Sequence, residues 1–296
     1  MTKTYLGIDV GGSAIKYGIV DEKGEVLSSS SLPTIDDKAD VLQKFAAIIR
    51  ESGNVSAVGI SFPGVIQGKG YLKTAGAIHS MFGVDLYAEM LKITDKPVAI
   101  LNDANAATLA EAMSGHAQGI SDYILIVVGT GIGGGIVING QIFAGATGMA
   151  GEFGLISLDI YSDNAAEDIS FSRHGATIGG LARYYHEISG DETVDAKEIF
   201  QKYEANDDLA TQAVKHFYQS LAFGIINTIV TIDPEKVLLA GGVTNRPTFI
   251  TELTAEIAQI KNSFPRYDSI DFPKIEVAYH KNNAGIVGAA YAASQI

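Results

Sequence analysis

The chain contains no cysteine and no tryptophan, and it has few positively charged residues. Without cysteine it can form neither a disulfide nor a cysteine-ligated zinc site, and this composition is typical of cytoplasmic proteins. Its 34 acidic residues outnumber its 21 lysines and arginines, which gives a formal net charge of −13. Because non-specific binding to phosphate backbones depends on clustered positive charge, we expect no nucleic-acid partner.

Long hydrophobic runs and a leader pattern are also absent from the sequence. The apolar run at 5–10 is too short for the core of a leader and contains Asp9. No stretch of about 18 residues lacks a polar break, so we expect no membrane contact and a cytoplasmic location. At 296 residues the chain is longer than one typical core, which predicts two domains or lobes.

Strand and helix patterns alternate along the chain and predict a mixed α/β fold. A polar bend at Asn102 and Asp103 separates a short apolar strand from an alanine-rich helix that ends near Gly115. Further strands are predicted at 4–10, 15–20, 25–32, within 57–64, on both sides of the glycine turn in 123–138, and at 236–243. Further helices are predicted at 36–52, 178–189, 195–204, 207–230, 248–262 and 283–295.

Residues 5–20 and 123–138 form an internal repeat of strand, glycine turn and strand. They align without a gap, with Gly11 opposite Gly129. Two such hairpins spaced one domain apart predict two related lobes with a cleft between them. The predicted lobes are 1–115 plus 284–296, which is the smaller, and 116–283.

The two glycine turns do not fit the common nucleotide-binding fingerprints. GTGIGG at 129–134 matches the dinucleotide pattern, but strand-like GIVI follows where a helix is required. The P-loop pattern does not occur. Backbone N–H groups at bare hairpin tips, together with the hydroxyls of Ser13 and Thr130, suit phosphate binding, and an ordinary hairpin turn explains either tip equally well.

Six segments follow one another in order: DVGGSAIKYGIV (9–20), GISFPGVI (59–66), LNDANAA (101–107), GTGIGGGIV (129–137), AGEFG (150–154) and LLAGGV (238–243). Together they resemble the blocks of the ROK family, which is named for repressors, uncharacterised reading frames and sugar kinases, in the hexokinase–actin–Hsp70 superfamily. The resemblance implies two actin-like (ribonuclease H-like) lobes around a central cleft. It further implies an ATP- and Mg²⁺-dependent sugar kinase that forms a homodimer and phosphorylates a hexose hydroxyl, expected to be the 6-OH.

Asp103 is the predicted catalytic base. Phosphoryl transfer to an alcohol needs a base near the hydroxyl, and Asp103 stands between a strand and a helix. This position alone suits a helix cap equally well, and the resemblance implies the base. For Glu152, which the resemblance places on sugar hydroxyls, a plain surface loop stays an alternative. The residues implied to bind the sugar are Pro63, Gly64, Asn102, Asp103 and Glu152.

Asp9 has a different expected role, beside the ATP phosphates. The resemblance implies that it holds Mg²⁺ indirectly, through metal-bound water. Lys16 matches a lysine of the motif, and an exposed hairpin lysine explains it as well as a phosphate contact does. For the glycines that end the strand at 236–243, a simple turn is the alternative to an adenosine contact. The other residues implied to contact ATP are Gly11, Gly12, Ser13, Gly129, Thr130, Gly131, Gly241 and Gly242.

The resemblance breaks down in the segment after Glu152. Many ROK kinases have a histidine three residues further on and then a cysteine cluster for structural zinc, but here Leu155 stands at that position and no cysteine exists. We therefore expect no structural zinc. The second sugar-binding glutamate has no secure counterpart, although Arg173 lies near its position, beside His174. The segment 156–177 that takes the place of the cluster predicts a more open acceptor pocket for a larger sugar, such as the β-glucoside cellobiose, with glucokinase or N-acetylmannosamine kinase as alternatives.

Two other classes of function are less compatible with the sequence. A ROK repressor carries a helix-turn-helix domain before its first hairpin, whereas this acidic chain begins its first predicted strand near residue 4. A non-catalytic sugar-sensing module has no need of Asp103, Asp9 and both glycine turns.

Overall fold

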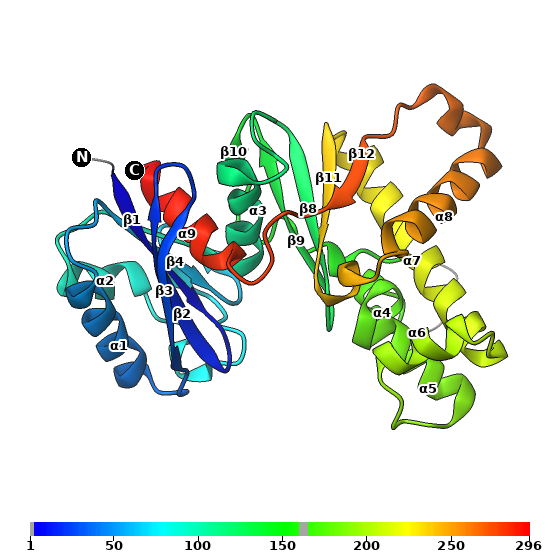
Figure 1. Ribbon diagram of the computed structural model, residues 1–296, viewed down its shortest axis with the longest axis horizontal. Coiled ribbons are helices and arrows are strands. Elements are labelled where there is room, and N and C mark those ends of the chain that lie inside the picture. The colour runs from blue at the N-terminus through cyan, green and yellow to red at the C-terminus, as the bar shows by residue number, and fades with distance from the viewer. Residues whose placement is uncertain (1–2, 160–164) are drawn as a thin grey trace. The chain divides into compact units, whose positions relative to one another are not determined.

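The computed structural model describes residues 3–159 and 165–296 (Figure 1). The chain divides into two compact units, which we call the first and the second unit. The lobe limits expected from the sequence stay a prediction. The first unit comprises Met1–Ser121, Gly135–Ala150 and Ala278–Ile296, and the second comprises Asp122–Gly134 and Gly151–Val277.

The first unit is built on a five-stranded sheet with the order β3-β2-β1-β4-β7. β1 runs antiparallel to β2, as the hairpin pattern predicted, and parallel to β4, which pairs in parallel with β7. The carboxyl ends of β1, β4 and β7 therefore meet at one edge of the sheet, where α/β proteins place their ligands. The strands are β1 (Thr4–Val10), β2 (Ala14–Asp21), β3 (Val26–Pro33), β4 (Val58–Phe62) and β7 (Val98–Asn102).

Successive residues of a strand point to opposite faces of the sheet, so this sheet has an apolar core on each face. A pair of helices packs against each face. Leu6 and Ile8 of β1 share an apolar core with Phe45 of α1. Tyr5 of the same strand belongs to a second core that includes Val287 of α9. The larger helices of this unit are α1 (Lys38–Glu51), α2 (Leu86–Ile93), α3 (Asp103–Ser114) and α9 (Ala284–Ser294), and its short elements are β5 (Ile66–Gln67), β6 (Tyr71–Leu72) and η1 (His79–Met81).

Glycines bring α9 into backbone contact with the sheet and with α3. A β-carbon added at Gly7 of β1 would lie 2.0 Å from the carbonyl oxygen of Ile286, and one added at Gly288 would lie 1.7 Å from that of Ala106. Neither site has room for a side chain, because non-bonded carbon and oxygen atoms do not approach so closely. The position of α9 is therefore set by backbone atoms, which cannot adapt as a flexible side chain can.

The second sheet has the strand order β10-β9-β8-β11-β12. β11 runs parallel to both β8 and β12. β9 pairs antiparallel with β10. Along the chain, the change from the second unit to the first falls within β9, between Gly134 and Gly135. The strands are β8 (Tyr123–Val128), β9 (Ile132–Ile138), β10 (Gln141–Ile142), β11 (Lys236–Ala240) and β12 (Lys274–Val277).

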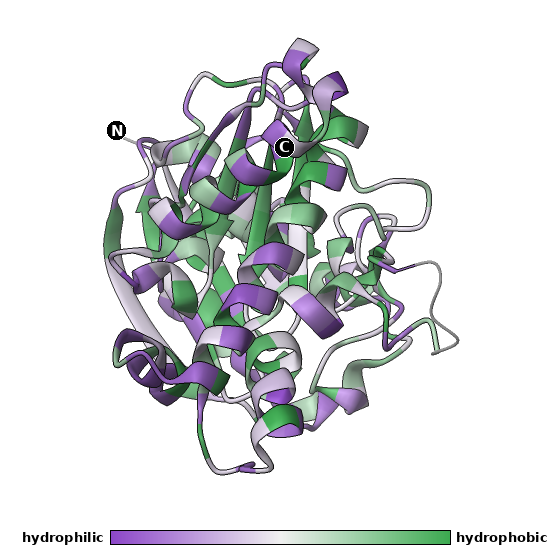
Figure 2. Ribbon diagram, turned by 90° about the vertical axis from the view of Figure 1, so that its right-hand side faces the viewer, coloured by the Kyte–Doolittle hydropathy of each residue, from purple (hydrophilic) through white to green (hydrophobic). Residues whose placement is uncertain are grey.

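Helices make up most of the rest of the second unit, and the 25-residue α7 is the longest. Phe217 and Leu221 of α7 are fully buried. In Figure 2 the strands carry mostly the hydrophobic colour, while the helices alternate between both colours, as amphipathic helices do. Over the described ranges no helix combines the length and the apolar character needed to cross a bilayer. These elements are η2 (Phe153–Leu155), α4 (Phe171–Gly175), η3 (Thr177–Ala182), α5 (Arg183–Ser189), α6 (Ala196–Glu204), α7 (Asp208–Ile232), η4 (Gly242–Asn245), α8 (Phe249–Ser263) and η5 (Pro265–Ser269).

The predicted helix at 178–189 is wrong in its first half, where η3 is a π-helical turn. Two consecutive glycines weaken the α-helix there and let the turn approach its neighbours. A β-carbon at Gly180 would lie 2.3 Å from the carbonyl oxygen of His174. The four-residue strand β12 was not predicted, because four residues give too little periodicity. Predicted elements that are present include 4–10, 15–20, 25–32, 36–52, 195–204, 207–230, 248–262 and 283–295.

Candidate active site

Asp9 lies in the first unit near the carboxyl end of β1, between Lys16 on β2 and Ser61 on β4. The fully buried Ser61 donates a hydrogen bond from Oγ to Asp9 Oδ1, at 2.8 Å. Burial raises the pKa of the Asp9 carboxyl above its usual range, while the Ser61 hydrogen bond and the charge of Lys16 oppose this rise. The strand thus holds a desolvated carboxylate in a fixed direction.

The first turn of α9 closes the other side of Asp9. A β-carbon added at Gly285 would lie 2.2 Å from Asp9 Cγ and 2.3 Å from Oδ1. Only a residue without a side chain fits between the helix and this carboxylate. The partial positive charge of a helix N-terminus favours an ionised acid at such a place. No local pattern indicated this role for Gly285, which lies 276 residues after Asp9 in the chain.

Asp103 is the first residue of α3, directly after β7. From the sequence, Asp103 could have been the N-cap of this helix, but the N-cap is its neighbour Asn102. Asn102 Oδ1 accepts hydrogen bonds from the backbone N–H groups of Ala104 (2.9 Å) and Asn105 (3.1 Å). Asp103 Oδ1 accepts from the Ala104 N–H, at 2.8 Å. Its side chain is open to solvent at one side, yet enough protein surrounds it that desolvation raises its pKa, and the negative charge of Asp9 adds to the rise.

The predicted sugar loop lies beside Asn102. The amide nitrogen of Asn102 donates to the carbonyl oxygen of Gly64, at 2.9 Å. Gly64 has φ +99°, and a β-carbon there would lie 2.6 Å from the Thr74 carbonyl oxygen, so the turn after Pro63 requires glycine. The first unit therefore brings Pro63, Gly64 and Asn102 together with Asp103.

The predicted phosphate turn is the tip of the β1–β2 hairpin. Gly11 N–H donates to the Ala14 carbonyl at 2.9 Å, and Thr34 Oγ1 donates to the Gly11 carbonyl at 2.6 Å. Gly12 and Ser13 are exposed. Lys16 is exposed as well, and its charge reaches Asp9. Phosphate binding by these residues stays a prediction.

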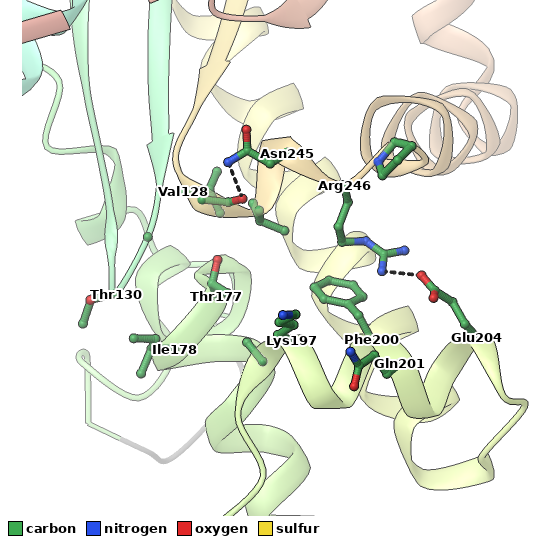
Figure 3. Close-up of a pocket in the computed structure, with 15 residues that line it drawn as sticks. Val128, Thr130, Thr177, Ile178, Lys197, Phe200, Gln201, Glu204, Asn245 and Arg246 are labelled. Carbon is green, nitrogen blue, oxygen red and sulfur yellow. Dashed lines mark hydrogen bonds and ion pairs between the residues drawn. The ribbon is translucent and has the colours of Figure 1, made fainter. Parts of the chain in front are cut away.

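The second unit contains a pocket of about 660 Å³ between the end of β8, η3, α6 and η4 (Figure 3). Three of the predicted ATP contacts line it: Gly129, Thr130 and Gly242. Gly241 precedes the lining residue Gly242 and packs against Val128. Its φ of +110°, and the 2.0 Å between an added β-carbon and the Val128 carbonyl oxygen, exclude any other residue there. Gly131 does not line the pocket, and its carbonyl accepts the Gly129 N–H at 2.9 Å.

A flat wall in this pocket was not predicted. The guanidinium of Arg246 lies over the ring of Phe200, 3.8 Å from its centroid, and pairs with Glu204 at 2.9 Å (Figure 3). Ile178 adds apolar surface. The hydroxyl of Thr177 is buried and has no hydrogen-bond partner among the residues described. A planar heteroaromatic group with polar edges matches these walls.

Glu152 precedes the short helix η2, in the second unit. Gly154 packs closely against Ser172, because a β-carbon added at Gly154 would lie 2.1 Å from the Ser172 hydroxyl oxygen. The same oxygen accepts a hydrogen bond from the Ile132 N–H, at 2.8 Å. This contact fixes the block around Glu152 to the start of β9. Leu155, at the position of the family's zinc histidine, is 68% exposed.

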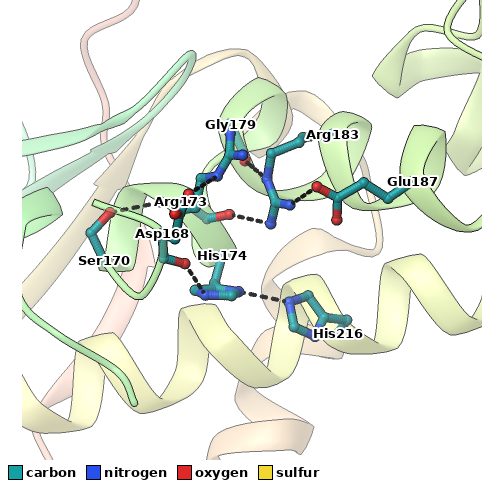
Figure 4. A network of polar contacts seen from close by, with 8 residues as sticks. All are labelled: Asp168, Ser170, Arg173, His174, Gly179, Arg183, Glu187 and His216. Carbon is teal, nitrogen blue, oxygen red and sulfur yellow. Dashed lines mark hydrogen bonds and ion pairs between the residues drawn. The ribbon is translucent and has the colours of Figure 1, made fainter. Parts of the chain in front are cut away.

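Both ring nitrogens of His174 are hydrogen-bonded within the protein (Figure 4). Its Nε2 donates to the Asp168 carbonyl at 2.8 Å, so its Nδ1 accepts from Nε2 of His216, at 3.1 Å. Tyr184 stacks on the ring of His216. Burial, aided by His174, lowers the pKa of His216 to about 4. Arg173 pairs with Asp168 at 3.5 Å.

Part of the segment in the place of the zinc cluster, 160–164, lies outside the described residues. Within the described ranges no group of three or more His, Cys, Asp and Glu side chains is placed to hold a metal ion. The ring contacts of His174 and the cap of Ser170 on α4 connect the described part of this segment to the helices.

Comparisons with known proteins give consistent matches. The model of the ROK family matches residues 5–296. A Listeria innocua protein named beta-glucoside kinase is 35% identical over 288 residues, which cover 96% of this chain and 95% of that protein. A solved ROK hexokinase from Thermus thermophilus has a TM-score of 0.87 and 27% identity, with 99% of this chain and 98% of that chain covered. A ROK glucokinase from Streptomyces griseus, solved with glucose and AMPPNP, has a TM-score of 0.74 and 26% identity, with 99% and 100% covered.

Proposed function

Because the chain belongs to the ROK family, we propose that it is an ATP-dependent sugar kinase that phosphorylates a β-glucoside. The expected mixed α/β, actin-like fold is confirmed by the matches to solved ROK kinases. The observation that carries the catalytic assignment lies within the first unit. There, Asp103 projects from the start of α3 beside the sugar loop and within the field of Asp9.

Asp103 is the proposed general base. Desolvation and the charge of Asp9 raise its pKa, which increases its affinity for the proton of a sugar hydroxyl. As the hydroxyl oxygen forms its bond to the γ-phosphorus of ATP, the proton passes to Asp103 and the bond to the β-phosphate oxygen breaks, which releases ADP. The N–H of Ala104 keeps the carboxylate in one orientation for this transfer.

The sugar side is assigned to Asn102, Gly64 and Glu152. Asn102 is held by its own cap and by the Gly64 carbonyl, so its position is defined before a sugar arrives. A carboxylate such as Glu152 accepts hydrogen bonds from neighbouring hydroxyls. The exposed apolar Leu155 supports a larger acceptor, since sugar rings pack on apolar surface. The name of the Listeria innocua relative supports a β-glucoside.

The pocket of the second unit is the proposed adenosine site. The flat wall of Phe200 and Arg246 suits a purine, and the unpartnered hydroxyl of Thr177 suits its polar edge or the ribose. Thr130 at the pocket wall would place its backbone N–H and hydroxyl toward the phosphates, while Gly129, whose N–H is bonded to the Gly131 carbonyl, would leave room for a close approach. The AMPPNP complex of the Streptomyces griseus glucokinase supports ATP as the donor.

Asp9 is the residue proposed to hold Mg²⁺, through water. Its buried carboxylate, with the raised pKa that desolvation causes, fits a site that a divalent cation would stabilise. When bound, Mg²⁺ would neutralise charge on the phosphates. Asp9 itself needs to stay ionised and fixed in direction, which the Ser61 hydrogen bond and the start of α9 both favour.

The homodimer is proposed on the family resemblance, and the location and the expected lack of a nucleic-acid or membrane partner are proposed on composition and charge. We expect a cytoplasmic homodimer, without a nucleic-acid or membrane partner, and closure of the protein when sugar binds, because water in an open site would compete with the sugar. Light scattering coupled to gel filtration tests the dimer. Small-angle scattering with and without saturating sugar tests closure, and an unchanged radius of gyration would contradict it.

A coupled ADP-release assay with Mg²⁺-ATP and a panel of cellobiose, glucose and N-acetylmannosamine tests the function. We expect turnover with a higher kcat/KM for cellobiose, and a large loss in Asp103→Asn. Asp85→Asn is the matched control, because Asp85 also stands at the start of a helix, where it caps α2. A preference for glucose or N-acetylmannosamine would reject the β-glucoside assignment. No turnover with any sugar would favour a non-catalytic sugar sensor.

A further inference from the structure

Glu111, near the end of α3, is a fully buried carboxylate that the proposed reaction does not use. Its Oε2 accepts hydrogen bonds from the backbone N–H groups of His116 (2.9 Å) and Tyr279 (3.1 Å), and its Oε1 accepts from that of His280 (2.8 Å). A carboxylate is costly to remove from water, and strong hydrogen bonds from fixed donors offset that cost. Glu111 therefore binds backbone that is distant in the sequence.

Tyr279 and His280 lie where the chain returns from the second unit to the first. β12 belongs to the second unit and ends at Val277, and Ala278 is the first residue of the returning part. The helix α9 begins four residues after His280. The two oxygens of one carboxylate thus hold two consecutive N–H groups at the start of the returning segment.

Further contacts make this attachment rigid. Ser114 Oγ is hydrogen-bonded to Nε2 of His280 at 3.1 Å. The ring of His116 meets that of Tyr279 edge-on, with 5.6 Å between centroids. A β-carbon added at Gly115 would lie 2.5 Å from Glu111 Oε2, so the turn after α3 closes directly over the carboxylate.

The same two helices carry the carboxylates of the active site. Asp103 is the first residue of α3, and Glu111 lies eight residues later, about two turns along one rigid helix. α9 follows the returning segment, is in backbone contact with α3 at Gly288, and touches the Asp9 carboxylate with Gly285. The place where the returning segment is attached therefore determines where α9 meets Asp9.

We propose that Glu111 is a positioning residue for phosphoryl transfer, because it ties the returning segment to the helix that carries Asp103. This inference rests on the proposed function. Bending of the connection to the second unit then occurs before Tyr279, and Asp9 and Asp103 keep their spacing during turnover.

Glu111→Gln tests the inference with almost no change in volume. The amide nitrogen of glutamine must face at least one backbone N–H that the carboxylate accepts, so donor meets donor. We expect hydrogen exchange at the amides of Tyr279 and His280 to become at least about tenfold faster, and kcat for the best sugar to fall about tenfold or more. The Kd for adenosine should not change, because the proposed adenosine pocket lies wholly in the second unit.

Leu109→Val on the same helix is the matched control, because Leu109 is buried and its truncation lowers stability, while the hydrogen bonds of Tyr279 and His280 described above come from Glu111 and Ser114. A fully active Glu111→Gln variant with fast exchange at both amides would reduce Glu111 to a structural role and overturn the inference. So would an equal loss of kcat in Leu109→Val at equal stability. A wild-type chain that phosphorylates no sugar would instead overturn the proposed function, and this inference with it.

If Glu111→Gln does not fold, Ser114→Ala decides the question. It removes the contact with the His280 ring and leaves the carboxylate in place. We then expect a loss of kcat of about two- to fivefold with an unchanged Kd for adenosine, since one of several attachments is lost. An unchanged kcat in Ser114→Ala would overturn the inference.

Discussion

Replacing Gly285 by alanine places one methyl group against the Asp9 carboxylate. The added carbon would lie 2.2 Å from Cγ, 2.3 Å from Oδ1 and 2.6 Å from Oδ2, whereas ordinary contacts begin near 3.4 Å. One partner has to move by about 1 Å. α9 cannot easily do so, because Gly288 is already in contact with the carbonyl of Ala106. We therefore expect Asp9 to move.

The cost follows from the contacts that Asp9 loses. Overpacking of this kind costs about 1–3 kcal/mol, and a buried Ser61 hydroxyl without its acceptor costs about 1–3 kcal/mol more. We expect the free energy of unfolding to fall by roughly 2–6 kcal/mol. A displacement of about 1 Å at a catalytic group can cost about a hundredfold in rate, so kcat/KM should fall to that extent.

A double-mutant cycle with Asp9→Ala distinguishes this mechanism from general damage to α9. Once Asp9 has no carboxylate, the methyl group at position 285 has space, and the stability cost of Gly285→Ala should fall by at least about 1 kcal/mol. Gly288→Ala is the matched control on the same helix, since its methyl group meets Ala106 instead. Denaturant unfolding and the ADP-release assay give both quantities. The reasoning is refuted if Gly285→Ala has wild-type stability and activity, or if its stability cost is the same without the Asp9 carboxylate.

Three further outcomes are expected. Asp103→Asn should lower kcat by about 10²–10⁴-fold, leave the Kd for AMPPNP unchanged and make the fold more stable, as calorimetry can check. Arg246→Ala should raise the KM for ATP about tenfold, because it removes one wall of the proposed adenosine pocket, and it should change the KM for sugar little. Equal changes in both KM values would contradict the pocket assignment. Because the folded state lowers the pKa of His216 to about 4, the unfolded state binds more protons between pH 6.5 and 4, and stability should fall as the pH drops through this range. His216→Gln should flatten this dependence, and an unchanged slope would exclude His216 as its source.

The sequence predicted the parts of the fold that depend on local patterns. Apolar runs rich in Ile, Val and Tyr on either side of the Gly11 turn identified the first hairpin, and the helical spacing in 36–52 identified α1. The π-helical turn η3 could not be predicted in this way, because its shape depends on what lies against Gly179 and Gly180. Nothing in the local pattern indicates that the carbonyl of His174 lies there.

In the candidate site, too, some residues could be predicted from local patterns and others could not. Asp103, Asn102 and Gly64 are each marked by a strand end or a turn, and the fold brings them together. The sequence left the choice between cap and base open for Asp103, and the hydrogen bonds of Asn102 provide the cap. Contacts between distant segments, such as Gly285 with Asp9 or Arg246 with Phe200, carry no local signal and could not be predicted from a single sequence.

The expected gain in stability from Asp103→Asn follows from the raised pKa of the Asp103 carboxyl in the folded state. A carboxyl whose pKa is raised in the folded state binds its proton more tightly there than in the unfolded chain. Stability therefore falls as the pH rises from the unfolded value of 3.8 through the folded one, and at neutral pH the ionised Asp103 destabilises the fold. At position 111 the carboxylate accepts hydrogen bonds from three backbone N–H groups. Asparagine at position 103 removes an unfavourable charge, whereas glutamine at position 111 removes a well-bound one, so the two substitutions should change stability in opposite directions while both lower kcat.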